Sequence, residues 1–267
     1  MIIGQKKLLS KLNTYTIDTF PHSVLLIGEK GSGKHLIASY IQENIIKFPL
    51  IDISKEVSDE VIDNIYRNPN PAVYLIDLAE MTEKEQNVLL KFIEEPLNNA
   101  FIILLCENKN FVLSTVLNRC VTFETDQYSR DELATFIEDK GDKELMLNFL
   151  RTPGKILNTN LSNISDILNV CDKIVNKLNI ANYSNALSIC DKINYKDEYN
   201  KFDLDLFLDC LSYSLSANYR TSNNKIIYEM FCITRDERKK LVDKRLNKQS
   251  FMYNLISKLW RKSREVA

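Results

Sequence analysis

The sequence has few residues that interrupt secondary structure, since its 267 residues include only six glycines and six prolines. This scarcity argues against long flexible linkers and favours a chain dominated by helices. The sequence also lacks any run near the roughly 18 uninterrupted apolar residues that a membrane helix needs, and residues Met1 to Gln5 do not begin a signal peptide. We therefore expect a cytoplasmic protein with no membrane-spanning segment.

Paired cysteines and a strong net charge are absent as well. The six cysteines lie singly, with no Cys-x-x-Cys pair and no nearby histidine, so we expect no metal site and favour reduced core thiols over disulfides. The formal net charge is −1, which gives no global attraction to nucleic acid. Any nucleic-acid role therefore needs a local patch or a partner.

Three of the six glycines lie in one stretch, where residues 24–36 read V-L-L-I-G-E-K-G-S-G-K-H-L. A buried strand that ends in Gly-x₄-Gly-Lys and re-enters a helix lets backbone N–H groups converge on a phosphate. Gly28, Gly31 and Gly33 would allow positive φ and a close approach of the backbone, and Lys34 would reach the β- and γ-phosphates. The alternative is a structural glycine-rich turn.

Two positions depart from a working ATP site. His35 stands where a serine or threonine hydroxyl would bind Mg²⁺, and imidazole suits this hard ion poorly. The buried run 72–77 ends in Asp77, which is in the right place to hold Mg²⁺ through water; its alternative role is to cap a helix or form a salt bridge. Leu78 then replaces the glutamate that polarises water, and Glu80 comes too late in the chain.

The apolar runs predict an α/β domain, a five-stranded parallel sheet with helices on both faces, followed only by helices. Two capping boxes, beginning at Thr82 and Ser129, should each start a helix. We expect three domains, at 1–126, 127–161 and 162–267: the α/β domain, a small helical lid and an all-helical collar. The strands are expected at about 24–27, 48–53, 72–77, 100–106 and 121–123, and the C-terminal helices at 130–139, 142–151, 162–178, 182–193, 203–217, 224–232 and 236–262.

Several ordered motifs closely resemble those of the AAA+ subunits of replicative DNA clamp loaders, above all the delta-prime subunits of bacterial DNA polymerase III. The resemblance covers residues 1 to about 158, and the remainder is similar only in being helical and of suitable length. The motifs are Ile3-Gly4-Gln5, Pro21-His22, Gly28 to Lys34, Leu75-Ile76-Asp77, Met81-Thr82, Gln86-Asn87, Leu89-Leu90, Glu94-Glu95-Pro96, Asn118-Arg119-Cys120 and Thr152-Pro153-Gly154-Lys155.

This resemblance implies a role in DNA replication within a hetero-pentameric ring of subunits, where ATP binds between neighbours. Arg119 matches the arginine of the family's Ser-Arg-Cys motif, although asparagine replaces the serine, and it would act as an arginine finger in trans on the next subunit's ATP. The alternative is a surface arginine at a strand start. Lys155 stands at the second sensor position. The implied partners are the other clamp-loader subunits and, through them, the sliding clamp and primer-template DNA.

The departures at His35 and Leu78, with no clear threonine at the first sensor position in residues 105–108, favour a subunit that does not hydrolyse ATP but completes a neighbour's site. Its own degenerate site would be empty or hold ATP or ADP without productive Mg²⁺. Two other hypotheses are an active AAA+ ATPase, such as a small clamp-loader ATPase subunit or a helicase loader, and a self-contained nucleotide enzyme such as a kinase. The family's usual four-cysteine zinc insertion is missing.

The C-terminal stretch from Arg235 is locally basic, with eleven lysines or arginines against four acidic residues, and Phe251, Tyr253 and Trp260 are interleaved. Such a patch could contact nucleic-acid phosphates. We favour the alternative, a solvated helix face whose aromatic side chains pack into the collar and neighbouring subunits.

Overall fold

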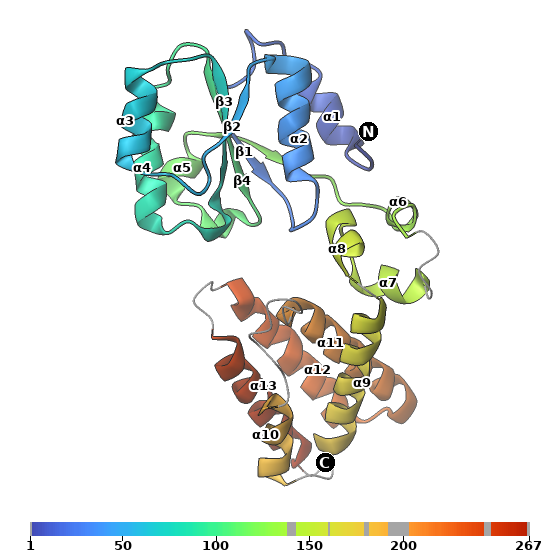
Figure 1. Ribbon diagram of the computed structural model, residues 1–267. Helices are drawn as coiled ribbons and strands as arrows, with labels where there is room; N and C mark the ends of the chain where they lie inside the picture. The colour runs from blue at the N-terminus through green and yellow to red at the C-terminus, as the bar shows by residue number, and fades with distance from the viewer. Residues whose placement is uncertain are drawn as a thin grey trace. The chain divides into compact units, whose positions relative to one another are not determined.

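The computed structural model divides the chain into two compact units (Figure 1). The first comprises Met1–Asp139 and Leu150–Asn158, and the second Lys140–Phe149 and Thr159–Ala267. The predicted division into three domains stays a prediction. The structure describes residues 2–137, 143–159, 161–178, 182–191, 203–242 and 247–265.

A five-stranded sheet forms the centre of the first unit, in the order β2-β3-β4-β1-β5, and every pair of neighbouring strands is parallel. All seven residues of β4 are buried, as expected for a strand whose two faces are both covered. This is the predicted parallel sheet. The strands are β1 (Ser23–Ile27), β2 (Leu50–Asp52), β3 (Ala72–Asp77), β4 (Ala100–Cys106) and β5 (Val121–Glu124).

Helices cover both faces of the sheet, as predicted (Figure 1). Alternate strand residues supply two separate cores, so that Val73 and Leu75 of β3 pack on the side of α1 and α2, whereas Tyr74 and Ile76 pack on the side of α3 and α4. The helical segments of this unit are α1 (Lys6–Leu12), α2 (Lys34–Ile41), η1 (Gln42–Ile46), α3 (Asp59–Arg67), η2 (Leu78–Glu80), α4 (Glu83–Glu94), η3 (Lys109–Phe111), α5 (Ser114–Leu117), α6 (Arg130–Ala134) and α8 (Pro153–Asn158).

Both predicted capping boxes are present. The Thr82 side chain accepts a hydrogen bond from the backbone of Glu85, and the Glu85 carboxylate accepts one in return from the Thr82 backbone. Ser129 and Glu132 make the same reciprocal pair at the start of α6. Each box satisfies two backbone donors that a helix start leaves unpaired, which explains why these starts could be located from the sequence.

The described part of the second unit consists of helices, as predicted. Its core is apolar, with Phe207 and Leu211 of α11 and Met252 and Leu255 of α13 almost completely buried. Its helical segments are α7 (Lys143–Phe149), α9 (Leu161–Leu178), α10 (Tyr183–Asp191), α11 (Leu204–Ser222), α12 (Lys225–Arg238), η4 (Lys239–Val242) and α13 (Lys248–Ser263).

The predicted helices at 224–232 and 236–262 are wrong in their boundaries. Helix α12 continues through Arg238, because the hydroxyl of the buried Thr234 donates a hydrogen bond to the Met230 carbonyl 3.0 Å away and so does not interrupt the helix. A new helix, α13, begins after Asn247, whose side chain accepts a hydrogen bond from the Ser250 backbone. An N-cap of this kind marks a helix start inside the stretch that the periodicity predicts as continuous.

All six cysteines lie in the described part of the chain, and none of them forms a disulfide. Burial raises the pKa of Cys120 and of Cys210 to about 12 and that of Cys171 upward too, so these groups stay protonated near neutral pH. Among the described helices, none is both long enough and apolar enough to cross a bilayer.

Candidate functional site

The predicted phosphate loop, Gly28 to Lys34, connects β1 to α2 at the carboxyl edge of the sheet. Gly31 and Gly33 have positive φ angles of 80° and 89°, as predicted, and Gly33 is the N-cap of α2. Gly28 differs, because its φ is not positive. It is needed instead for close packing, since a Cβ there would lie only 2.5 Å from the Ser32 hydroxyl. The loop therefore has the backbone form of a phosphate site.

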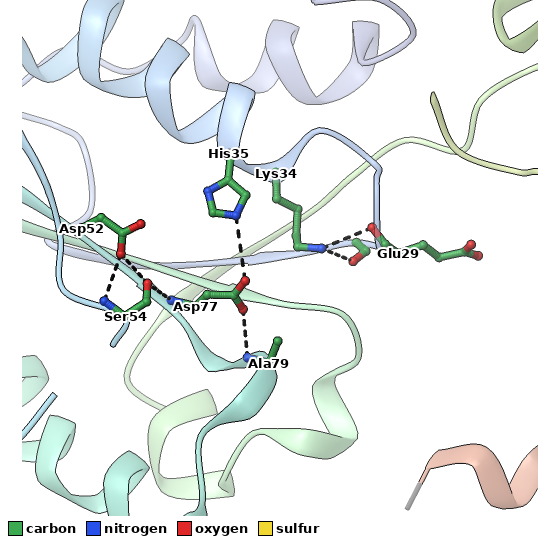
Figure 2. Close-up of polar contacts among 8 residues, drawn as sticks. Glu29, Lys34, His35, Asp52, Ser54, Asp77 and Ala79 are labelled. Carbon is green, nitrogen blue, oxygen red and sulfur yellow. Dashed lines mark hydrogen bonds and ion pairs between the residues drawn. The ribbon is translucent and has the colours of Figure 1, made fainter. Parts of the chain in front are cut away.

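The Lys34 side chain is folded back onto its own loop (Figure 2). Its ammonium donates to the Gly28 carbonyl at 2.7 Å and to the Glu29 carbonyl at 3.2 Å, and the residue is 7% exposed. Burial lowers the pKa of Lys34, and nearby carboxylates such as Glu107 oppose this shift. Lys34 thus already has partners that a phosphate would have to replace.

Three groups from distant parts of the chain hold the loop, and we call them the loop latch: Tyr128, Thr152 and Gly154. The Tyr128 hydroxyl donates to the Ser32 carbonyl at 2.9 Å, the Thr152 hydroxyl to the Lys30 carbonyl at 2.8 Å, and the Gly154 backbone N–H to the Gly31 carbonyl at 2.9 Å. The latch places α8, with the second-sensor candidate Lys155, directly beside the loop.

Replacing Gly154 with alanine should lower the free energy of unfolding of the first unit by about 1–3 kcal/mol. A Cβ at this position would lie 2.6 Å from the Gly31 Cα and 3.1 Å from its oxygen, and backbone atoms have no cheap way to move aside. Hydrogen exchange of the loop and α8 amides is the suitable measurement, because the single tryptophan, Trp260, reports on the second unit.

The matched control for Gly154→Ala is Leu157→Ala, which changes a 60% exposed side chain on the same helix. Surface changes of this kind stay within about 0.5 kcal/mol. Equal hydrogen-exchange rates of the loop and α8 amides in the two variants would contradict the prediction, because they would show that a side chain at position 154 fits beside Gly31.

The groups expected at a metal site are present but do not fit Mg²⁺. His35 Nε2 lies 3.9 Å from Asp77 Oδ2, and the pair is an ion pair only when the imidazole is protonated (Figure 2). The other oxygen of Asp77 accepts a hydrogen bond from the Ala79 backbone at 2.8 Å, so that Asp77 caps η2. Among the described residues, no cluster of three or more His, Cys, Asp or Glu could hold a metal. The capping alternative for Asp77 is thus realised, and its role toward Mg²⁺ stays a prediction.

Leu78, which replaces the catalytic glutamate, is 1% exposed and belongs to the core on the α3 and α4 side of the sheet. Its side chain therefore does not face the phosphate loop. The Glu80 side chain lies outside the described part of the chain. Asn108, in the first-sensor region, caps η3 by accepting a hydrogen bond from the Asn110 backbone at 3.0 Å.

Arg119 lies near the amino ends of the parallel strands, whereas the phosphate loop lies at their carboxyl ends. It precedes β5, whose first residue, Val121, pairs with Val24 at the start of β1, whereas the loop begins after Ile27 at the end of β1. Four residues of strand, roughly 13 Å, separate these two edges. The Arg119 side chain is 40% exposed. The structure thus brings together the predicted loop residues, His35, Asp77 and Lys155, but not Arg119.

Sequence reasoning missed the contact between Tyr128 and the loop and the partner of Arg119. Arg119 Nε lies 2.5 Å from Glu94 Oε1, at the end of α4. Both contacts join residues far apart in the chain, and neither spacing nor periodicity signals them. Glu94 does occur in one of the family-like motifs, but that motif does not indicate its partner.

Ion pairs within the second unit neutralise much of the basic C-terminal stretch. Lys240 and Lys258 both contact the buried Glu237, at 2.7 and 2.6 Å, and Lys262 lies 2.6 Å from Glu229. The ring of Trp260 packs against Tyr183 with the centroids 5.0 Å apart. These contacts favour the packed helix face over a nucleic-acid stripe.

The model of the family described as DNA polymerase III, delta subunit, matches residues 50–129. The chain is 28% identical over 171 residues to DNA polymerase III subunit gamma of Buchnera aphidicola subsp. Schizaphis graminum, covering 51% of this chain and 47% of that protein. It is 30% identical over 70 residues to DNA polymerase III subunit delta' of Haemophilus influenzae, covering 26% of this chain and 21% of that protein.

A solved structure of a DNA polymerase III gamma subunit-related protein from Thermotoga maritima aligns with 96% of this chain and 99% of its own, at 16% identity and a TM-score of 0.49. The chain spans about half the length of the gamma subunits it matches, or slightly more. The family-model match and the curated relatives together support a similarity to AAA+ clamp-loader subunits of the DNA polymerase III type.

Proposed function

We propose that this chain is a non-hydrolysing, delta-prime-like subunit of a DNA sliding-clamp loader, which completes a neighbouring subunit's ATP site with Arg119. The position of Arg119 carries this proposal. Because the arginine lies at the opposite edge of the sheet from the chain's own phosphate loop, its exposed guanidinium is suited only to a nucleotide bound by another subunit. A guanidinium fork can meet phosphate oxygens there and stabilise developing negative charge.

The chain's own nucleotide site supports the same proposal. The Lys34 ammonium already donates to loop carbonyls that it would have to leave for a phosphate, His35 offers an imidazole in place of a metal-binding hydroxyl, and Leu78 is buried. Hydrolysis needs a bound metal and an oriented water together, and these residues provide neither. The partners in this proposal are the other subunits of a five-membered ring and, through the ring, the sliding clamp and primer-template DNA. Residues 162–267 would form the collar that joins the ring.

One observation favours a second candidate, an active ATPase of the clamp-loader gamma type. The Gly-x₄-Gly-Lys pattern is intact, and several relatives are subunits gamma or gamma/tau. In this case the Lys34 ammonium would leave the Gly28 carbonyl when nucleotide binds.

Steady-state ATP hydrolysis by the isolated chain separates the two candidates. We expect turnover at the background level, unchanged by Lys34→Ala, and hydrolysis only when the chain is assembled with its partner subunits. The mass of the assembled complex should correspond to five subunits. Turnover by the isolated chain that Lys34→Ala abolishes would establish the ATPase instead, and the Lys34→Ala variant would need a native helical spectrum for this comparison.

A further inference from the structure

The Arg119 guanidinium is held on two of its three nitrogens. Nε lies 2.5 Å from Glu94 Oε1, and Nη1 donates to the Thr115 carbonyl at 2.8 Å. Among the described residues, Nη2 donates no hydrogen bond. The side chain is therefore fixed in direction, and Nη2 keeps its hydrogen-bonding capacity for an anion.

The supports of this arrangement are themselves fixed. The end of α4 is anchored by Tyr66, whose hydroxyl contacts the Lys91 and Glu95 carbonyls at 3.1 and 2.7 Å. The buried Gln86 of α4 bonds the Phe111 carbonyl and the Leu113 backbone N–H, each at 2.9 Å, which ties α4 to the segment leading into α5. Glu94 and Thr115 thus come from two helices with a defined spacing.

The geometry of the ion pair indicates whether Glu94 orients the Arg119 guanidinium or keeps it from binding a phosphate. A carboxylate that sequesters an arginine accepts two parallel N–H groups of the fork. No such pair of hydrogen bonds joins Arg119 to Glu94, whose carboxylate lies 2.5 Å from Nε. The side chains of Arg119 and Glu94 are 40% and 44% exposed, so their attraction is screened and the pair contributes only about 0–1 kcal/mol. The pair is too weak to withhold the guanidinium from a phosphate, but it removes rotamer freedom that binding would otherwise have to restrict.

We propose that Glu94 is a positioning residue for Arg119, which orients the guanidinium so that Nη2 points toward a nucleotide on the neighbouring subunit. This inference rests on the proposed trans role of Arg119. Glu94 itself touches no nucleotide and acts only through the arginine.

The test compares Glu94→Gln with Glu95→Gln in complexes reconstituted with the partner subunits. Glu95 is the adjacent, exposed acid, and its side chain makes no contact with Arg119. The quantity measured is the part of ATP hydrolysis that Arg119→Ala removes. We expect Glu94→Gln to lower the kcat of this Arg119-dependent hydrolysis about tenfold, which is the size of effect seen when groups that support a site are removed. The KM for ATP should stay within about twofold of the wild-type value. Glu95→Gln should leave both values unchanged.

A double-variant cycle shows whether Glu94 acts through Arg119. Glu94→Gln should have no further effect in a chain that already carries Arg119→Ala. A further loss in that background, or normal hydrolysis in the Glu94→Gln complex while Arg119→Ala is impaired, would overturn the positioning role and leave the proposed function intact. Faster hydrolysis with Glu94→Gln would also overturn it, because Glu94 would then withhold the arginine. If Arg119→Ala itself has no effect, it is the proposed function that fails.

Discussion

Replacing Arg119 with alanine should leave the chain folded and able to assemble, yet slow ATP hydrolysis at one neighbouring site by about 10³–10⁵-fold, the range of arginine fingers in related phosphoryl transfers. The fold should tolerate the change because the side chain is 40% exposed and its ion pair with Glu94 is a surface pair. The measurements are ATPase and clamp-loading rates of reconstituted complexes, with assembly followed separately by mass.

Arg119→Lys is the control that separates charge from geometry. A lysine keeps the positive charge but has no planar fork, so we expect it to restore little of the lost rate. Complexes with Arg119→Ala that assemble and hydrolyse ATP like the wild type would make Arg119 an ordinary surface residue. The similarity to clamp-loader subunits would then stand without a trans-acting role.

Replacing Leu78 with glutamate should destabilise the first unit by about 3 kcal/mol or more, rather than restore a catalytic base. Leu78 is 1% exposed among apolar side chains, so the change removes about 1.5–3 kcal/mol of apolar burial and places a carboxyl group in the core at a further cost of about 1–3 kcal/mol. Calorimetry or hydrogen exchange of the sheet amides would measure the loss. Leu78→Met, which conserves volume, should cost less than about 1.5 kcal/mol.

The pH dependence of Leu78→Glu provides a second readout. Burial should raise the pKa of the new carboxyl group in the folded chain, whereas in the unfolded chain it ionises near pH 4.3, the value of a free glutamate. Above that pH the unfolded state binds fewer protons, so the variant should lose stability relative to Leu78→Gln as the pH rises. A loss independent of pH would mean that the side chain at position 78 reaches water, and ATP turnover by Leu78→Glu would contradict its burial directly.

The fold was predictable where local patterns and burial agree. The bounds of β3 and β4 match the predicted runs, because strands covered on both faces are apolar along their whole length, and the Thr82 and Ser129 capping boxes mark their helix starts. The break between α12 and α13 was misplaced, since the buried hydroxyl of Thr234 and the Asn247 cap act through local hydrogen bonds that periodicity does not register.

The candidate site was predictable in its residues more than in its contacts. Positive φ at Gly31 and Gly33 follows from the loop pattern. The capping role of Asp77 was one of two open readings, and geometry was needed to show it. The Tyr128 and Glu94 contacts could not be anticipated, because their partners meet only after the sheet has formed.

The loop latch has a consequence for the order in which the protein folds. Thr152 and the Lys30 carbonyl are 122 residues apart in the chain, and the segment between them includes α7, which belongs to the second unit. The first unit is therefore discontinuous in sequence, and a growing chain that has emerged only as far as Asp139 lacks two of the three groups that hold the loop. Long-range contacts of this kind form late. A fragment ending at residue 139 should accordingly keep its sheet but expose the loop carbonyls to water, whereas one that continues through Asn158 contains every residue of the latch.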